Sequence, residues 1–182
     1  VIAAARRGAS AHGIEFNPDL VALSRRRARA AGVAARATFE RGDIFRSDFS
    51  DATVVTLFLL PELNLRLRPT LLAMRPGTRI VSNSFDMGDW TPDARAEVTV
   101  DCEHYCEAML WVVPARVAGM WTIDGRRSME LAQSHQKIGG IVREGASHWI
   151  LRDAGMDGAR IRFSLGEDRY EGEVRDGAME GT

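Results

Sequence analysis

Two acidic residues, Glu15 and Asp43, each follow a short strand-like segment, and their position suits them to bind a nucleoside. A helix is predicted to begin directly after Glu15, because Asn17 is a favourable N-cap and Pro18 suits the first helical position. A carboxylate at the end of a strand can accept two hydrogen bonds from the diol of a ribose, and a second one can accept from the base. The glycine-rich turn that usually precedes the first acid in such sites is absent from the sequence.

The segments that must position these acids alternate between strand and helix. The run Thr53–Phe58 is almost entirely apolar or β-branched, which is typical of a strand buried on both faces of a parallel sheet. The order predicts an α/β fold with a Rossmann-like, open and mostly parallel sheet that is truncated at its N-terminal end. The expected strands cover 9–15, 37–41, 53–58 and 79–85, and the expected helices cover 1–8, 18–31 and 64–75, the last broken by Pro69 or starting beyond it.

The second half of the sequence changes to short strands separated by glycine turns. Such turns are expected at Asp124-Gly125, Asp157-Gly158 and Asp176-Gly177, among others. We therefore predict two domains: a Rossmann-like domain over 1–115 that lacks its first strand and glycine-rich turn, and a small antiparallel β domain over 116–182.

Composition and charge narrow the class of protein. The formal net charge is -1, so nothing suggests a nucleic-acid partner. No apolar run approaches the roughly 20 residues of a membrane span, which favours a cytoplasmic location. The sequence does not begin with Met, so a targeting signal could lie upstream, and export is the alternative.

Cys102 and Cys106 are expected to be free thiols. Together with His104 they provide too few ligands for a closed zinc site, so no metal is expected.

Residues 12–93 resemble the class I S-adenosylmethionine-dependent methyltransferases. They are most similar to the protein-lysine methyltransferase family that includes the mitochondrial ATP-synthase c-subunit enzyme and its bacterial relatives. The segments that carry the resemblance are Gly13–Asp19, Gly42–Phe45, Phe58–Pro69, Pro76–Ser82 and Met87–Trp90.

The resemblance implies that the cofactor is S-adenosyl-L-methionine and that particular residues contact it. Glu15 would bind both ribose hydroxyls, and Asp43 would accept a hydrogen bond from the adenine amino group. Ile44 would pack on the adenine ring, which Phe16 would flank, and Asn17 lies beside them. The structural alternatives are that Glu15 is an exposed acid before a helix, that Asp43 is a turn acid and that Phe16 belongs to the core.

The segment after the expected strand over 53–58 would face the methyl group that is transferred. Phe58 would contact the cofactor, while backbone carbonyls around Leu60 and Pro61 would align a lysine amine. Glu62 is a candidate proton acceptor, although a solvent-facing acid is the alternative for it. Asn64 could cap the following helix.

The resemblance predicts an enzyme that methylates a protein lysine or a small-molecule acceptor. A nicotinamide-dependent Rossmann oxidoreductase is an alternative, because it would share Glu15, the acid at the end of the expected strand over 9–15. A further alternative is an inactive, truncated methyltransferase that acts as a binding module, since the cofactor's methionine part has no glycine-rich turn to contact. Met87–Trp90 could line the substrate entrance or pack in the core.

Overall fold

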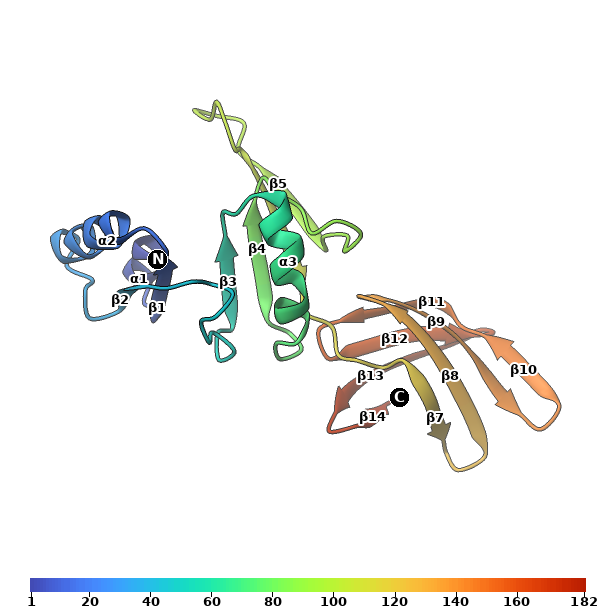
Figure 1. Cartoon of the computed structure of the whole chain (residues 1–182). Coiled ribbons are helices and arrows are strands. Elements are labelled where there is room, and N and C mark those ends of the chain that lie inside the picture. Colours follow the sequence, from blue (N-terminus) through green and yellow to red (C-terminus); the bar gives the residue numbers. More distant parts are fainter. The chain divides into compact units, whose positions relative to one another are not determined.

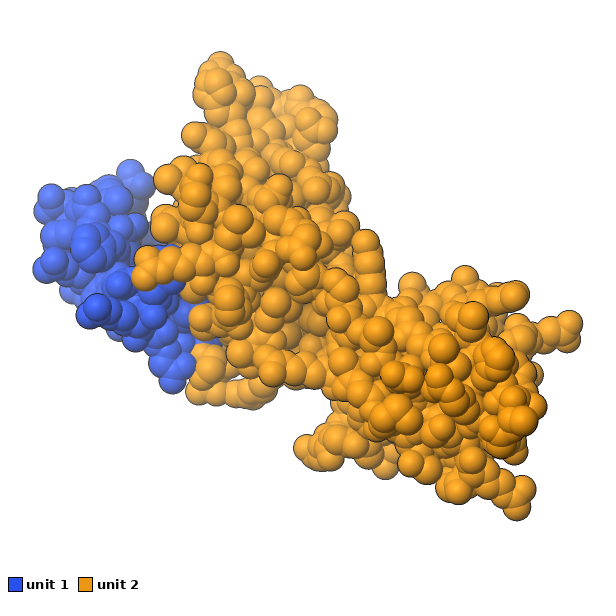
Figure 2. All heavy atoms as spheres, turned by 45° about the vertical axis from the view of Figure 1, so that its right-hand side comes forward, with its two compact units in different colours: residues 1–49 blue, residues 50–182 orange.

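The computed structural model describes residues 1–182, and these divide into two compact units, 1–49 and 50–182 (Figure 2). The first unit contains two helices and two strands. The second contains one helix and twelve strands, which form two further sheets (Figure 1).

The first unit is a two-stranded parallel sheet with two helices. Its core is made of small side chains, with Ala5, Ala28 and Ala37 fully or almost fully buried. The second helix begins as predicted, because the Asn17 side chain accepts a hydrogen bond from the Asp19 backbone N–H at 2.9 Å and Pro18 follows the cap. The elements are α1 (Ile2–Arg6), β1 (Ala11–Glu15), α2 (Pro18–Ala30) and β2 (Ala37–Arg41).

The second unit starts with a four-stranded mixed sheet in the order β3-β4-β6-β5. β3 and β4 are parallel, whereas β6 runs antiparallel to both β4 and β5. The prediction that β3 is buried on both faces is wrong: it is an edge strand, and Val54 is 42% exposed. An apolar β-branched run favours a strand but does not specify how many neighbours that strand has. The strands are β3 (Val54–Leu57), β4 (Arg79–Asn83), β5 (Ala94–Glu97) and β6 (Glu107–Val112).

The helix α3 (Pro61–Leu72) lies against this sheet and differs from its prediction (Figure 1). It begins three residues before the predicted start, with Pro61 at a first-turn position, and it continues through Pro69. A proline inside a helix removes one backbone hydrogen bond. The helix tolerates this loss because Leu67 and Leu71 are fully buried in the core.

Two tryptophans form the centre of this core. Trp90 and Trp111 are fully buried with ring centroids 6.1 Å apart, and the Trp111 Nε1 donates to the Trp90 carbonyl at 2.6 Å. Met87 is also fully buried. Of the two interpretations of Met87–Trp90, core packing is therefore the one that the structure supports for Met87 and Trp90.

The remaining strands form one antiparallel sheet of eight strands, as the glycine-punctuated pattern predicts. The strands are β7 (Gly119–Ile123), β8 (Arg127–Ser134), β9 (Lys137–Glu144), β10 (Ser147–Ile150), β11 (Arg152–Asp157), β12 (Arg160–Leu165), β13 (Asp168–Arg175) and β14 (Ala178–Gly181).

The two sheets of the second unit are joined by specific contacts. The His135 ring stacks on Trp90 with centroids 5.7 Å apart, and Gln136 Nε2 donates to the Thr91 carbonyl at 2.6 Å. The Ala115 N–H donates to the Gly158 carbonyl at 2.8 Å. None of the three helices in the structure has the length and apolar character that crossing a membrane requires.

Candidate active site

The structure brings Glu15 and Asp43 to the same edge of the first unit's sheet. Glu15 is the last residue of β1 and accepts a hydrogen bond through its carbonyl from the Gly42 N–H at 3.1 Å. Asp43 follows Gly42, two residues after the end of β2. Because the strands are parallel, both acids lie beyond the carboxyl ends, where open α/β sheets bind ligands.

Each carboxylate already holds its local backbone in place. Glu15 Oε1 accepts from the Asn17 N–H at 2.8 Å, and Asp43 Oδ1 accepts from the Phe45 N–H at 3.0 Å. Asp43 also lies 3.8 Å from the Arg46 guanidinium. These bonds fix the direction of both side chains, and a carboxylate oxygen can accept more than one hydrogen bond. Both acids therefore keep the capacity to bind a hydroxyl or an amino group.

The other expected cofactor residues of this unit surround the same edge. Phe16 is 71% exposed, so it is not the core residue that the alternative described. Ile44 is half-buried. The Asn17 side-chain oxygen is used as the helix cap.

The expected catalytic residues follow β3 in the second unit. Phe58 is 60% exposed at the carboxyl end of the strand. The Leu60 carbonyl accepts from the N–H groups of Leu63 and Asn64, both at 3.0 Å, so it is engaged in the start of α3. Pro61 and Glu62 are exposed in the first turn, where the helix dipole favours the Glu62 carboxylate. Of the backbone carbonyls expected to align an amine, that of Leu60 is thus occupied by the helix.

Asn64 is a residue of this site whose role sequence reasoning missed. It lies inside α3 rather than capping it, and it is fully buried. Its Nδ2 lies 3.1 Å from the Phe85 carbonyl and 3.2 Å from the Asp86 carbonyl and from the Ser82 hydroxyl. Its side chain therefore ties α3 to the turn that follows β4. The sequence feature that could have revealed this role is that Asn64 lies on the same helical face as the apolar residues Leu67 and Leu71.

An aromatic cluster that the sequence did not reveal lies at the carboxyl ends of β3 and β4 in the second unit. It consists of Phe58 after β3, Phe85 after β4 and Tyr105 between β5 and β6. The ring centroids of Phe58 and Tyr105 are 5.1 Å apart, and Phe85 lies 5.9 Å from each of them. We call Phe58, Phe85 and Tyr105 the aromatic cluster.

The prediction of free thiols is wrong, because Cys102 and Cys106 form a disulfide. The chain reverses direction between β5 and β6, and this reversal brings the two Cα atoms to 5.8 Å, within the range that a disulfide spans. A spacing of four residues does not reveal such a turn in the sequence. The disulfide closes the short loop that contains Tyr105.

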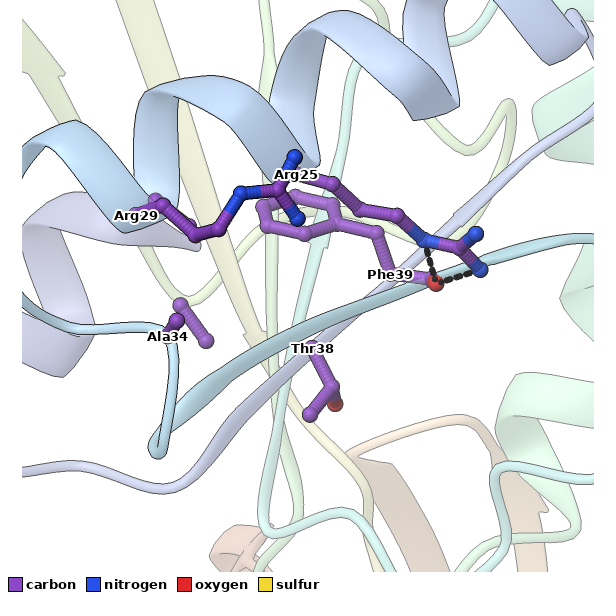
Figure 3. A pocket seen from close by; sticks show the side chains of 7 residues that line it. Arg25, Arg29, Ala34, Thr38 and Phe39 are labelled. Atoms are coloured by element: carbon purple, nitrogen blue, oxygen red, sulfur yellow. Dashed lines mark hydrogen bonds between the residues drawn. The ribbon is translucent and has the colours of Figure 1, made fainter.

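A hollow in the first unit does not coincide with Glu15 and Asp43. It has a volume of about 220 Å³ and lies between α2 and β2 (Figure 3). Arg25 on its wall donates from Nε and Nη2 to the Phe39 carbonyl, at 3.0 and 2.6 Å (Figure 3). These donors of Arg25 are therefore engaged, and four of the seven lining residues are alanine or phenylalanine.

A family model for the ANTKMT methyltransferase domain matches residues 1–94, which is more than half of the chain. The chain belongs to the ANTKMT methyltransferase family. The match covers β1, β2, β3, α3 and β4, and it therefore includes Glu15, Asp43 and the segment after β3. The methyltransferase resemblance inferred from sequence is confirmed.

Relatives of this ANTKMT family member carry methyltransferase names. A protein-lysine N-methyltransferase of Saccharolobus islandicus (strain REY15A) is 40% identical over 81 residues, which are 44% of this chain and 50% of the relative. The mouse lysine N-methyltransferase of the ATP-synthase c-subunit is 39% identical over 94 residues, 51% of this chain and 38% of the relative. The chain thus spans half or less of the length of these relatives.

A solved structure is also similar. The crystal structure of an RNA methyltransferase from Salinibacter ruber, in complex with S-adenosyl-L-homocysteine, is 45% identical with a TM-score of 0.59. The similarity covers 64% of this chain and 74% of that one.

Proposed function

We propose that this ANTKMT family member is an S-adenosylmethionine-dependent methyltransferase that methylates a lysine side chain of a protein. The observation that carries the proposal is the position of Glu15 and Asp43 beyond adjacent parallel strands, inside the segment that matches the family. The relatives named as lysine methyltransferases and the neighbour that binds S-adenosyl-L-homocysteine support it.

The proposed cofactor fits the donor and acceptor groups of this edge. When bound, S-adenosylmethionine supplies an activated methyl group. Glu15 would accept hydrogen bonds from the ribose hydroxyls, and Asp43 would accept one from the adenine amino group. Phe16 and Ile44 would contact the adenine ring, and their exposed or half-buried side chains are available for this. In the second unit, Phe58 would contact the cofactor.

Charge favours a lysine over a nucleic acid as the acceptor, although the Salinibacter neighbour is named an RNA methyltransferase. Carboxylates stand close in sequence to the members of the aromatic cluster: Glu62, Asp86 and Glu103 are all exposed. Such a surface repels phosphate and attracts an ammonium group. The amine must lose its proton before it attacks, and Glu62 is our candidate acceptor for that proton.

We also propose that the sheet is Rossmann-like and that the boundary between the two domains lies between residues 115 and 116. β1 and β3 each pair with one neighbour only, so each has an edge that can accept a further strand. The change of sheet between β6 and β7 supports the division. Because no glycine-rich turn is present to contact the methionine part of the cofactor, we expect weak cofactor binding by residues 1–182 alone.

Titration with S-adenosylmethionine and, separately, with NAD tests the proposal. We expect S-adenosylmethionine to raise the melting temperature and NAD to leave it unchanged. Glu15→Gln should weaken S-adenosylmethionine binding about 10- to 100-fold, because hydrogen bonds to a charged acceptor are lost. Glu40→Gln is the matched control, since Glu40 is an exposed acid within β2 rather than beyond a strand end.

The acceptor is tested by transfer of a labelled methyl group to protein, followed by mass spectrometry of the modified residue. Label on lysine is the expected result. Binding of NAD instead of S-adenosylmethionine, or label confined to RNA, would overturn the proposal.

A further inference from the structure

We propose that the aromatic cluster of Phe58, Phe85 and Tyr105 binds the ammonium group of the acceptor lysine, in its unmethylated and its methylated forms. The inference deepens the proposed function and rests on it. Rings of this kind attract alkylammonium ions through their negative faces, and methyl-lysine recognition is a known use of that attraction.

The cluster is open to an incoming side chain. Phe58 is 60% exposed and Tyr105 is 56% exposed, although aromatic side chains of this size are usually buried. Phe58 and Tyr105 meet edge to face at an interplanar angle of 80°, so their faces point in different directions. A lysine that approaches the cluster can therefore place its ammonium group over an open ring face while its methylene carbons contact a neighbouring ring.

Three separate segments bring the rings to one edge of the sheet. Phe58 and Phe85 follow β3 and β4, which are parallel, so they leave the sheet at the same edge. The loop of residues 98–106 leaves the sheet there too, because Glu97 at the end of β5 pairs with Glu107 at the start of β6. Figure 1 shows this loop extending beyond β5. The cluster thus lies at the carboxyl ends of β3 and β4, next in sequence to Leu60, Pro61 and Glu62, the candidate catalytic residues.

The backbone that presents the rings adopts conformations that ordinary residues avoid. Tyr105 has φ of 60°, and Ser84, directly before Phe85, has φ of 62°. The left-handed region is unfavourable for residues other than glycine, and such residues gather at binding and active sites. Asn64 stabilises the Phe85 turn by donating to the carbonyls of Phe85 and Asp86. The positions of two of the three rings are therefore imposed by the surrounding structure.

The charge of the neighbouring loop complements a cation. From Glu97 to Glu107 the chain carries four carboxylates and no lysine or arginine. Glu107 is already paired with Arg95, while Asp101 and Glu103 are exposed. These acids raise the local concentration of a basic side chain, and the rings then contact its ammonium group and methylene carbons.

The experiment compares three small probes by nuclear magnetic resonance titration of the 182-residue chain. The probes are acetyl-trimethyllysine amide, acetyl-lysine amide and the neutral analogue with a tert-butyl group in place of trimethylammonium. If the rings recognise the charge, trimethyllysine should bind about 3- to 30-fold more tightly than its neutral analogue. The resonances that shift should belong to the aromatic cluster.

Variants separate the cluster from general apolar binding. Tyr105→Leu and Phe85→Leu should each reduce the preference for the charged probe. Trp149→Leu is the control, because Trp149 is an exposed aromatic residue on β10, outside the cluster. The proposal is overturned if the neutral analogue binds as tightly as the charged one, if no probe binds, or if Tyr105→Leu leaves the preference unchanged.

The same samples distinguish failure of this inference from failure of the proposed function. Binding of S-adenosylmethionine is measured alongside each probe titration. If the cofactor binds and the charged probe does not, the inference fails while the proposed function stands. If neither S-adenosylmethionine binding nor methyl transfer is found, the proposed function fails as well.

Discussion

His135 shows how the fold constrains the charge of a single residue. Its ring is half-buried and stacks on Trp90 at an interplanar angle of 15°. Burial lowers the pKa of His135 below its usual value, and the attraction of Asp89 opposes this only in part. The unfolded chain therefore binds a proton at His135 more readily than the folded chain. Consequently the free energy of unfolding should fall as the pH drops below about 6.5, until the folded state is protonated too.

The substitution His135→Asn tests this pH dependence. Asparagine does not titrate, and it tolerates the φ of 56° at this position. Urea unfolding between about pH 7.5 and about pH 5 should show a smaller loss of stability in the variant than in the parent chain. His148→Asn, at an exposed position on β10, should behave like the parent. Equal losses for the parent and for His135→Asn would contradict the assignment.

Residues whose chemistry depends on their place at a strand end could be predicted from the sequence. Residues whose role depends on a partner far away in the chain could not. Glu15 and Asp43 could be found because apolar runs and the Asn-Pro helix start mark their positions. Tyr105 could not be found, since its ring partners are 47 and 20 positions earlier in the chain. Whether Glu15 and Asp43 bind the cofactor stays a prediction.

At the scale of the elements, α3 and the turn after β4 depend on one side chain. Replacing Asn64 with leucine roughly keeps the side-chain size but removes the donor to the carbonyls of Phe85 and Asp86. We expect Asn64→Leu to lower the free energy of unfolding by about 1–3 kcal/mol, because two partly buried carbonyls lose their donor. It should also weaken binding of the trimethyllysine probe. Thr70→Leu, at an exposed position of α3, should change stability by less than about 0.5 kcal/mol.

The loop between β5 and β6 depends on its disulfide in a similar way. Reduction, or the double substitution Cys102→Ser and Cys106→Ser, should weaken binding of the trimethyllysine probe, because Tyr105 then has more conformations available. S-adenosylmethionine binding, measured in parallel, should not change. An unchanged affinity for the probe would show that the disulfide does not position Tyr105.

Elements were predictable where a local pattern determines them. α2 was predicted almost to the residue, because its N-cap Asn17 and its first-turn Pro18 are local signals. β5 was missed, since Ala94–Glu97 has no apolar alternation and all four residues are exposed. That strand exists because it pairs with β6, which no local pattern encodes.

At the scale of the whole molecule, the close packing of the second unit's two sheets depends on glycine. Gly158 has φ of 59°, and a Cβ atom there would lie 3.0 Å from the Gly77 Cα. Gly166 has nearly the same φ, 62°, but a Cβ atom there would meet nothing within 4 Å. These two positions therefore separate the cost of the backbone conformation from the cost of crowding.

We expect Gly166→Ala to destabilise the chain by about 1–2 kcal/mol through its left-handed conformation alone. Gly158→Ala should cost about 1–3 kcal/mol more, because the turn before β12 must move away from Gly77. Thermal unfolding of both variants measures the difference. Equal costs would show that the contact between the two turns is not tight.

The unpaired edge of β3 has a consequence for how the protein behaves at high concentration. Its sequence, Val-Val-Thr-Leu, contains no charge and no proline, the two features with which natural edge strands prevent association. Two molecules can therefore pair through this edge, and further copies can add to exposed strands. Turbidity that grows with concentration, and that a lysine in place of the exposed Val54 suppresses, is the behaviour to expect from concentrated solutions.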